Sequence, residues 1–417
     1  MRIIIHSKGT FCNLARMKIL LVCQHYYPEP FRVTKIAEDL VRRGFEVTVL
    51  TGIPNYPEGE YYPGYSKHEN RKQTINGVEI IRAYELPRKK GVVHRVLNYY
   101  SFSFFGSRLA KKLPGTFDCI LTVGLFPIMM ANPAIAYKKR WGVPILMYEM
   151  DLWPESLLAG GIKKGSLIYN HYKKVSRKIY SQIDRILVTS KSHIDYIASL
   201  TQNLGAISWL PQFADDPFDS EHRSFKEKDI TTFLFAGNIG KAQSCMTILL
   251  AAERLLKTAK ARFLFVGSGS ELTHLQAYQK ARNLTNVEFV GRVPLKEMGK
   301  YYQQADCAIV SLASDSYCQM TVPGKVQSYL KAGLPILSID SGETSRWIQE
   351  IGCGLTCPSE NVEALCKTIS DFIALPTSQK EVFSSAGRSY FEAHLTENQF
   401  MCELEQNLLT LAKLVKN

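Results

Sequence analysis

The sequence predicts an α/β protein of two Rossmann-like, doubly wound domains whose parallel sheets face a common cleft. Short apolar runs alternate with segments of helical spacing in two separate series, which is the pattern of repeated βαβ units. A stretch rich in proline and charge, residues 208–229, separates the two series and is expected to be the domain linker. The chain has 417 residues, enough for two ordinary domains.

The first series opens with an apolar run at residues 17–22, which we expect to be a strand. Residues 31–43 then carry apolar side chains at helical spacing, and Gly44 ends this helix before a second strand at residues 46–50. A strand, a helix and a strand in this order form a parallel βαβ unit. The further strands expected in this domain are residues 78–81, 119–123, 145–148 and 185–189.

The second series begins after the linker and repeats the alternation. Its expected strands are residues 231–236, 262–266, 287–290, 307–311, 336–339 and 354–356. We therefore expect an N-terminal domain at residues 17–207 and a second domain at residues 230–394. Residues 1–16 have no periodic core pattern and no signal-peptide cleavage site, so we expect a leader outside the fold.

Composition limits the kind of partner. The net charge of +13 predicts an acidic partner: phosphates, nucleic acid or an anionic membrane. No apolar run in the sequence approaches the roughly 18–20 residues of a membrane-spanning helix. Of the ten cysteines, only Cys353 and Cys357 lie close in sequence, which is a weak metal signal. Buried free thiols in a reducing cytoplasm are the expected alternative.

The most informative stretch is VPGKVQSYLKAGLPI, residues 322–336. Pro323 and Gly324 break the preceding segment, and Lys325–Lys331 then has the length of two short helical turns before a glycine and a proline end it. The N–H groups of the first turn and the Lys325 ammonium would together bind an anion. An ordinary helix–strand connection with a solvated lysine explains this segment equally well.

This stretch resembles the donor-nucleotide helix of retaining glycosyltransferases of the GT-B class, sequence family 4. Its P-x-K-x-Q-S-Y variant resembles the branch of bacterial fucosamine transferases in O-antigen and capsule assembly. Further segments resemble the family in the same order along the chain: HYYPEPFRVTKIAEDLVRRGFEVTVLTGIPNYPEG from His25, YEMDLWPESLLAGG from Tyr148, WLPQFADDPF from Trp209, FLFAGNIGKAQ from Phe233 and FVGSGSEL from Phe265. The resemblance implies a GT-B fold with an acceptor-side N-terminal domain and a nucleotide-binding second domain. It also implies a last helix, residues 395–417, that crosses back to the N-terminal domain.

The resemblance implies a nucleotide-sugar donor, UDP-linked in our expectation, bound by the second domain. Glycine turns after two strands would let the backbone approach a diphosphate, and Lys241 and Lys325 would stabilise its charge. The donor-side residues implied are Gly237, Asn238, Gly240, Lys241, Gly267, Arg292, Val293, Pro323, Lys325, Gln327 and Ser328. Plain turns and a solvated Arg292 explain these residues without a ligand. Met320 and Ser328 stand where the family usually has two glutamates.

Carboxylates near the strand at residues 145–148 are the acid/base candidates. Many family members carry His-Asp here, and Met150 replaces the histidine, which leaves Glu149, Asp151 and Glu155. A carboxylate at this place would orient the acceptor hydroxyl or take its proton. Alternatively, Asp151 caps the following turn and Glu155 lies at the surface.

The predicted catalytic set joins these carboxylates to the two lysines: Asp151, Glu149, Lys325 and Lys241. His25 is expected to be a packed loop residue rather than a catalyst. The sequence contains no Asp-x-Asp motif, so we expect neither a metal ion nor another cofactor.

A basic and aromatic tract at residues 88–112 is the candidate membrane contact. It holds seven Lys and Arg and no acidic residue, interleaved with Tyr and Phe. Because the family's acceptors are often polyprenyl-linked sugars, we expect a cytoplasmic enzyme at the inner face of the plasma membrane. A buried helix with basic ends remains open for this tract. The competing functions are a GT-B epimerase of UDP-N-acetylhexosamine and a nucleic-acid-binding α/β protein.

Overall fold

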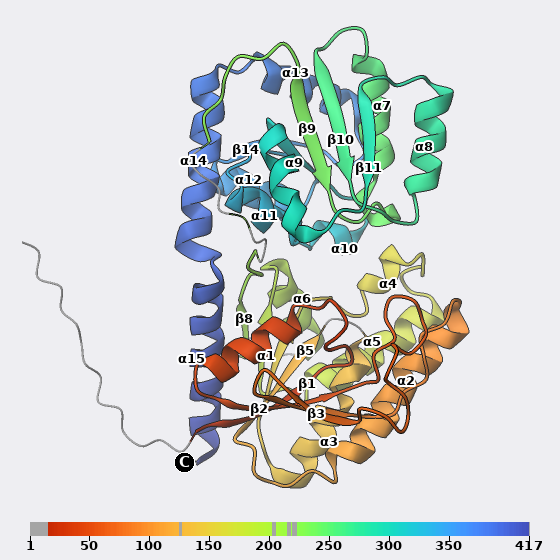
Figure 1. The fold of residues 1–417 in the computed structure, drawn as a ribbon, viewed down its shortest axis with the longest axis vertical. Helices are drawn as coiled ribbons and strands as arrows, with labels where there is room; N and C mark the ends of the chain where they lie inside the picture. The colour runs from red at the N-terminus through yellow and green to blue at the C-terminus, as the bar shows by residue number, and fades with distance from the viewer. Residues whose placement is uncertain (1–15, 125–126, 202–205, 215–217, 219–222, 417) are drawn as a thin grey trace, which may run out of the picture. The chain divides into compact units, whose positions relative to one another are not determined.

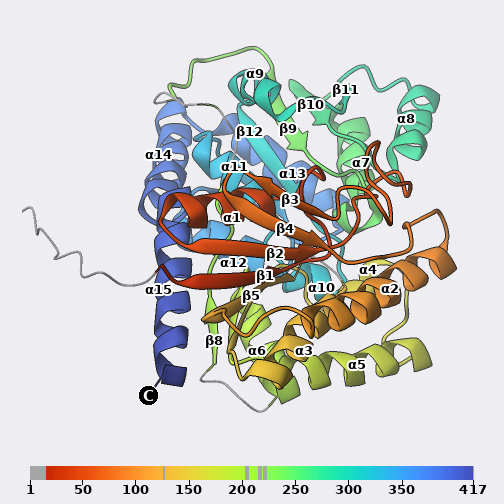
Figure 2. The same ribbon diagram turned by 60° about the horizontal axis from the view of Figure 1, so that its bottom comes forward.

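The computed structural model describes residues 16–124, 127–201, 206–214, 218 and 223–416. This part of the chain contains two sheets, each accompanied by helices (Figures 1 and 2). The predicted leader, residues 1–16, lies outside the described residues apart from Arg16. Parts of the predicted linker, residues 215–217 and 219–222, lie outside them too.

The first sheet has eight strands in the order β3-β4-β2-β1-β5-β6-β7-β8. Their bounds are β1 Lys18–Val22, β2 Glu46–Thr51, β3 Lys72–Ile75, β4 Val78–Arg82, β5 Cys119–Gly124, β6 Ile145–Glu149, β7 Arg185–Val188 and β8 Ile207–Trp209. Strand β1 pairs in parallel with β2 and β5, so that Leu20 lies opposite both Thr48 and Ile120. Figure 2 shows β1, β2, β4 and β3 side by side.

Strand β3 forms a hairpin with β4, and this pair is antiparallel. The two residues between the strands, Asn76 and Gly77, have φ of 50° and 80°. Positive φ at both central positions is the requirement of a type I′ turn, which Asn-Gly satisfies well. Strand β3 is not among the strands expected from the sequence, although this dipeptide is the signal of its hairpin.

The helices of the first half are α1 Val33–Arg42, α2 Val92–Ala110, η1 Ile128–Ala131, α3 Asn132–Trp141, α4 Ser156–Ala159, α5 Leu167–Tyr180 and α6 Ser192–Thr201. Helix α1 buries Val33, Ile36 and Leu40, the apolar positions whose spacing predicts it. Gly44, with φ of 96°, lets the chain turn directly into β2.

The second sheet has six strands in the order β11-β10-β9-β12-β13-β14. They are β9 Thr231–Ala236, β10 Ala261–Val266, β11 Val287–Gly291, β12 Cys307–Ser311, β13 Ile336–Ile339 and β14 Gly354–Cys357, and all pairs along this order are parallel. Figure 1 shows α7 and α8 beside β10 and β11. The core on this side includes three stacked or tilted phenylalanine pairs, such as Phe233 with Phe263 at 5.6 Å.

The helices that accompany the second sheet are η2 Lys241–Gln243, α7 Cys245–Leu255, α8 Leu272–Ala281, η3 Leu295–Glu297, α9 Met298–Gln304, α10 Ser316–Gln319, α11 Lys325–Lys331, α12 Glu343–Ile351, α13 Val362–Ala374, α14 Thr377–His394 and α15 Glu397–Lys416. Alternation of parallel strands and helices around two sheets confirms the predicted fold class. The expected strands all form, with ends that agree or differ by one residue.

The chain divides into two compact units that do not follow the sequence order strictly. The first unit is Met1–Met150, Lys178–Ile186 and Leu404–Asn417, and the second is Asp151–Arg177 and Leu187–Glu403. Part of α15 therefore belongs to the first unit, where Glu405 pairs with Arg43 at 3.2 Å. In the second unit, the Glu343 carboxylate accepts hydrogen bonds from the backbone N–H groups of Lys191 and Ser192 at 2.5 and 2.7 Å.

Candidate functional site

Two glycine turns pack against each other at the carboxyl ends of β9 and β10. Gly237 and Gly267 have φ of 127° and 148°, which side chains rarely permit. A Cβ atom at Gly267 would lie only 1.8 Å from the Gly237 carbonyl oxygen. Hydrogen bonds of 2.8 Å run from Gly237 N to Val266 O and from Gly267 N to Gly291 O. Backbone hydrogen bonds thus connect the carboxyl ends of β9, β10 and β11. Because the glycines of the two turns carry no side chains, a ligand could approach their main chain closely.

The Lys325 ammonium lies beside the first of these turns, the one at Gly237. Its Nζ lies 3.3 Å from the position that a Cβ atom at Gly237 would take. The same Nζ donates to Gln243 Oε1 at 2.9 Å and lies 3.7 Å from the centroid of the Phe235 ring. Burial lowers the pKa of Lys325 to about 8. The lysine is therefore a desolvated cation placed directly beside glycine backbone.

The rest of α11 anchors this lysine to the sheet. The Tyr329 hydroxyl accepts a hydrogen bond from the backbone N–H of Ala236, the last residue of β9, at 2.8 Å. Gln327 is buried, and with its amide nitrogen facing inward it donates to the carbonyls of Pro323 and Gly324 at 3.1 and 3.0 Å. Gln327, in the first turn of α11, therefore ties the helix to the Pro323–Gly324 turn before it, and Ser328 is partly exposed on the helix.

The other predicted donor-side residues lie on the loops around this point. Lys241 and Asn238 are exposed, and a Cβ atom at Gly240 would lie 2.8 Å from Asn238 Nδ2. Arg292 is exposed after β11, whereas Val293 packs on the core of the second unit. The contact with the Gly237 turn is made by Lys325, and Lys241 lies in the short η2 that follows the loop.

Asp151 is held by a tyrosine that the sequence analysis did not single out. The Tyr317 hydroxyl, in α10, donates to Asp151 Oδ1 at 2.7 Å. Burial raises the pKa of Asp151 to about 6, and this hydrogen bond limits the rise. The pKa of Asp151 therefore lies closer to neutral pH than that of a solvated aspartate.

Glu155 is buried, contrary to the alternative that it lies at the surface. It accepts hydrogen bonds from the Tyr169 hydroxyl at 2.6 Å and from Ser316 Oγ at 3.3 Å, and Lys164 Nζ lies 3.5 Å away. These contacts join α4, α5 and α10 within the second unit. Glu155 thus has the geometry of a structural anchor beside Asp151.

Glu149 is also buried, at the end of β6 in the first unit. A Cβ atom at Gly124, the last residue of the neighbouring β5, would lie 2.7 Å from Glu149 Oε2. The Glu149 carboxylate therefore occupies the space that a side chain at position 124 would take, so a glycine is required there.

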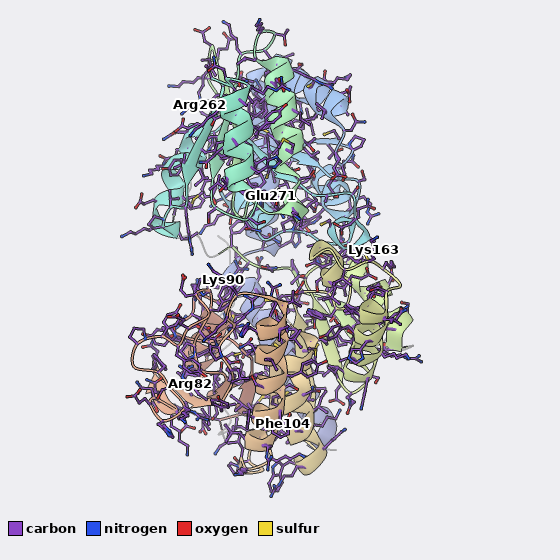
Figure 3. All side chains as sticks on the ribbon, turned by 90° about the vertical axis from the view of Figure 1, so that its right-hand side faces the viewer. Arg82, Lys90, Phe104, Lys163, Arg262 and Glu271 are labelled. Carbon is purple, nitrogen blue, oxygen red and sulfur yellow. The ribbon has the colours of Figure 1, made fainter. Side chains whose placement is uncertain are left out.

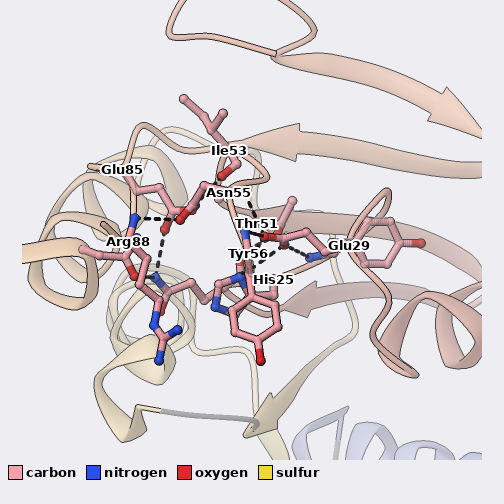
Figure 4. A network of polar contacts seen from close by, with 12 residues as sticks. His25, Glu29, Thr51, Ile53, Asn55, Tyr56, Glu85 and Arg88 are labelled. Carbon is pink, nitrogen blue, oxygen red and sulfur yellow. Dashed lines mark hydrogen bonds and ion pairs between the residues drawn. The ribbon is translucent and has the colours of Figure 1, made fainter. Parts of the chain in front are cut away.

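A polar network shapes the loops of the first unit after β1 and β2 (Figure 4). His25 Nδ1 lies 3.1 Å from Glu29 Oε1, and the His25 ring stacks on Phe31 at 5.1 Å. The Glu29 carboxylate also accepts the N–H groups of Asn55 and Tyr56 at 2.9 and 2.7 Å. These bonds fix the proline-rich loop at residues 53–57.

A second buried carboxylate, Glu85, completes this network. Glu85 accepts from Gln24 Nε2 at 2.9 Å and from Asn55 Nδ2 at 2.7 Å. Burial raises the pKa of Glu85 well above its ordinary value. Two carboxylates in one buried network therefore hold the two loops of the first unit together.

No group of three or more His, Cys, Asp and Glu side chains within the described ranges is arranged to hold a metal ion. Cys353 and Cys357 are buried free thiols, and burial raises the pKa of Cys357 to about 11. Both behave as packed residues rather than ligands or nucleophiles.

Apart from Gln243, which accepts from Lys325, the site residues that sequence reasoning missed are aromatic. Phe235, Tyr317 and Tyr329 contact Lys325, Asp151 and the β9 end respectively. Phe235 and Tyr329 lie within the motifs quoted above, but apolar patterning classes both as core. Tyr317 lies outside those motifs, and its sequence gives no signal of the contact with Asp151.

Two family models match the chain. Residues 32–208 match the model described as Glycosyltransferase Family 4, and residues 230–374 match that of Glycosyl transferases group 1. Among curated proteins, the chain is 28% identical over 262 residues to a probable glycosyltransferase WbjE of Pseudomonas aeruginosa, covering 60% of this chain and 64% of that protein. It is 22% identical over 409 residues to a putative colanic acid biosynthesis glycosyl transferase WcaI of Escherichia coli K12, covering 92% and 98%.

Solved structures share the fold at low sequence identity. A sucrose-phosphate synthase from Thermosynechococcus elongatus has a TM-score of 0.75 at 15% identity, covering 95% of this chain and 99% of that one. Anabaena HepE in complex with UDP and glucose has a TM-score of 0.66 at 9% identity, covering 94% and 99%. Together with the family matches, this likeness identifies the chain as a glycosyltransferase of the GT-B fold, built from a family 4 domain and a group 1 domain.

Proposed function

We propose that this glycosyltransferase moves a sugar from a UDP-linked donor, with retention of configuration, to a polyprenyl-linked glycan of O-antigen or capsular polysaccharide. An N-acetylated amino or deoxyamino sugar is the proposed donor group, following the resemblance to fucosamine transferases. The names of the two curated relatives and the UDP bound by Anabaena HepE support this proposal. Its main structural support is the Lys325 ammonium above the Gly237 turn.

The donor diphosphate would lie against the Gly237 and Gly267 turns. In such a transfer the largest charge develops on the departing diphosphate, so a fixed cation beside it accelerates bond cleavage. Lys325 is already desolvated and oriented by Phe235 and Gln243, which reduces the reorganisation that catalysis requires. Lys241 would supply a second, solvated charge, and no metal ion would be needed.

On the acceptor side we assign Asp151 and Glu149. With a pKa near 6, Asp151 is mostly ionised at neutral pH and would orient the acceptor hydroxyl or take its proton. Tyr317 holds this carboxylate in place. Glu149, at the end of β6, would be the second carboxylate able to orient the acceptor hydroxyl or take its proton.

The membrane contact of this proposal is α2. Its exposed apolar residues include Val93, Leu97, Tyr100 and Phe104, which are 69%, 47%, 40% and 54% exposed and recur at helical spacing on one face. Figure 3 labels Phe104 on this helix and Lys90 just before it. An exposed apolar stripe with basic residues at both ends favours an interfacial helix over a buried one. Among the residues that the structure describes, no helix is long and apolar enough to cross a membrane.

Thermal shift with a panel of nucleotide sugars tests the donor assignment. A donor at 100 times its Kd should stabilise the protein by about 2.7 kcal/mol. UDP-linked N-acetylhexosamines and deoxyamino sugars should shift the Tm most, and transfer to a polyprenyl-diphosphate sugar should follow with the same donor. A chain that responds to none of these, or that only epimerises the donor, would contradict the proposal.

A further inference from the structure

A second surface, on α5 and the turn before it, has the properties of a lipid-binding site. The chain has no acidic residue between Glu155 and Asp184, and the same stretch carries Lys163, Lys164, Lys173, Lys174, Arg177 and Lys178. Figure 3 labels Lys163 on the turn that leads into α5. A stretch of this charge attracts polyanions irrespective of their kind.

The α5 surface also exposes large apolar side chains. Leu167 is 91% exposed and Ile168 is 53% exposed, both in the first turn of α5. Leu167 is the most exposed large hydrophobic residue among those described. Two adjacent apolar side chains in a basic environment suit a bilayer interface, where the apolar groups leave water while the cations meet phosphates.

A basic hollow lies further along the same helix. It has a volume of about 490 Å³ and is lined by Asn170, Lys173, Lys174, Arg177, Ser199 and Leu200 from α5 and α6. Within the described ranges, no carboxylate pairs with Lys173, Lys174 or Arg177. Asp195 stands one turn before Ser199 on α6 and does not line the hollow. Three cations, an amide and a hydroxyl are donors that match a phosphodiester.

We propose that α5 binds anionic lipid, with Leu167 and Ile168 entering the bilayer interface and a lipid phosphate held by Lys173, Lys174 and Arg177. This inference rests on the proposed function only in that a lipid-linked acceptor brings the enzyme to a membrane. The α5 surface consists of other residues than α2: residues 163–177 belong to the second unit, and α2 belongs to the first. Exposed apolar side chains favour lipid over nucleic acid, which would leave Leu167 in water.

The experiment is sedimentation with phosphatidylcholine vesicles that contain or lack phosphatidylglycerol. Replacing Lys173, Lys174 and Arg177 by Gln should weaken binding to the anionic vesicles roughly 100-fold, since each cation near such a surface contributes about fivefold. The matched control replaces Lys257, Lys280 and Lys296, three exposed lysines of the same unit, by Gln. Its binding to the anionic vesicles should weaken much less. Leu167→Ser with Ile168→Ser should weaken binding as well, whereas Leu295→Ser with Val382→Ser, at exposed apolar positions elsewhere, should not.

Several outcomes would overturn the inference. One is that the α5 variants bind anionic vesicles as well as wild type does. Another is that the lysine control loses as much vesicle binding as the α5 triple variant. A third is that soluble glycerophosphate or RNA abolishes vesicle binding completely. Thermal shift by nucleotide sugars is measured on the same variants and should be unchanged. A donor response that persists while α5 proves irrelevant would refute this inference and leave the proposed function standing.

Discussion

Lys325 Nζ lies 3.7 Å from the centroid of the Phe235 ring, and no carboxylate of the described residues pairs with it. The aromatic face and the Gln243 amide stabilise the ammonium without neutralising it. A carboxylate partner would compete with a phosphate for the same cation. The pair therefore keeps a positive charge in place and available for an anion.

The first prediction concerns this charge. Lys325→Ala should lower kcat by 10²–10³-fold, the effect of removing one preorganised stabiliser of a developing charge. Steady-state kinetics with the donor found by thermal shift would measure it. Lys280→Ala, at an exposed position on α8, is the control and should retain wild-type turnover. A Lys325→Ala enzyme that is folded and fully active would refute the diphosphate assignment.

The second prediction follows from the Lys325 pKa of about 8. The free site is charged below this pH and neutral above it, so nucleoside diphosphate affinity should fall roughly tenfold between pH 7 and pH 9. Calorimetric titration at several pH values would show the fall, with proton uptake on binding near pH 8. Lys325→Arg should flatten the profile, because the guanidinium stays charged throughout. A wild-type affinity that is constant over this range contradicts the assignment.

The third prediction concerns Asp151, whose pKa burial raises from 3.8 to about 6. The native state then binds more protons than the unfolded state between pH 4 and 6, so ionisation of Asp151 lowers the free energy of unfolding as pH rises through this window. Asp151→Asn should therefore increase the free energy of unfolding at pH 7 by about 1–2 kcal/mol, with a matching rise in Tm. Below pH 4 the substitution should give no gain in stability.

Activity should respond to Asp151→Asn in the opposite direction to stability. Loss of the carboxylate should lower turnover by 10²–10⁴-fold if it takes the acceptor proton. Asp229→Asn, at an exposed aspartate, should change neither quantity measurably. Tyr317→Phe should move the acid limb of the pH–rate profile to higher pH, because the hydroxyl stabilises the ionised form. An unmoved limb would separate Asp151 from the chemistry.

The fourth prediction concerns the basic residues at the start of α2. Replacing Lys89, Lys90 and Arg95 by Gln should release the enzyme from anionic vesicles and reduce transfer to lipid-linked acceptors only. Arg88 is left unchanged, because its guanidinium lies over the Tyr56 ring at 5.3 Å. High salt should have the same effect as the triple variant. Vesicle binding equal to wild type at low salt would make α2 an ordinary surface helix.

The fifth prediction is that turnover survives EDTA. Lys325 and Lys241 would supply the positive charge at the diphosphate, so chelation should leave kcat unchanged within error. The assay compares EDTA-treated enzyme with and without added Mg²⁺ or Mn²⁺. Activity that disappears with the chelator and returns with either ion would show that the lysines do not carry this role alone.

Much of the fold follows from the sequence, because parallel strands buried on both faces appear as short apolar runs. The strands β9, β12 and β13 form at the predicted residues, since turn residues delimit each run sharply. Strand β3 was missed because its residues, Lys72–Ile75, are exposed or half-buried and carry no apolar run, so that only the following Asn-Gly marks it. Two of the three residues of β8, Ser208 and Trp209, were absorbed into the predicted linker, because so short a strand gives no periodic signal.

The site could be predicted in part. Glycine turns and Lys325 are visible in the sequence, because backbone freedom and charge are properties of single residues. The roles of Phe235, Gln243 and Tyr317 depend on which elements meet in space, and no local pattern encodes that. The donor contact of Gln327 stays a prediction, and no local pattern encodes that its amide, with the nitrogen facing inward, donates to the Pro323 and Gly324 carbonyls.

The hydrogen bonds that Glu343 accepts from Lys191 and Ser192 bear on how such enzymes can be recombined. A chimera joined at residue 208 would take Glu343 from one parent and α6 from another, and the Asp151–Tyr317 contact would be divided in the same way. Exchange of donor specificity between relatives should therefore work best when residues 151–177 and 187–207 travel with the group 1 domain. The segment to be exchanged would therefore be discontinuous in the sequence, even though the two sheets suggest a single division between an N-terminal and a C-terminal half.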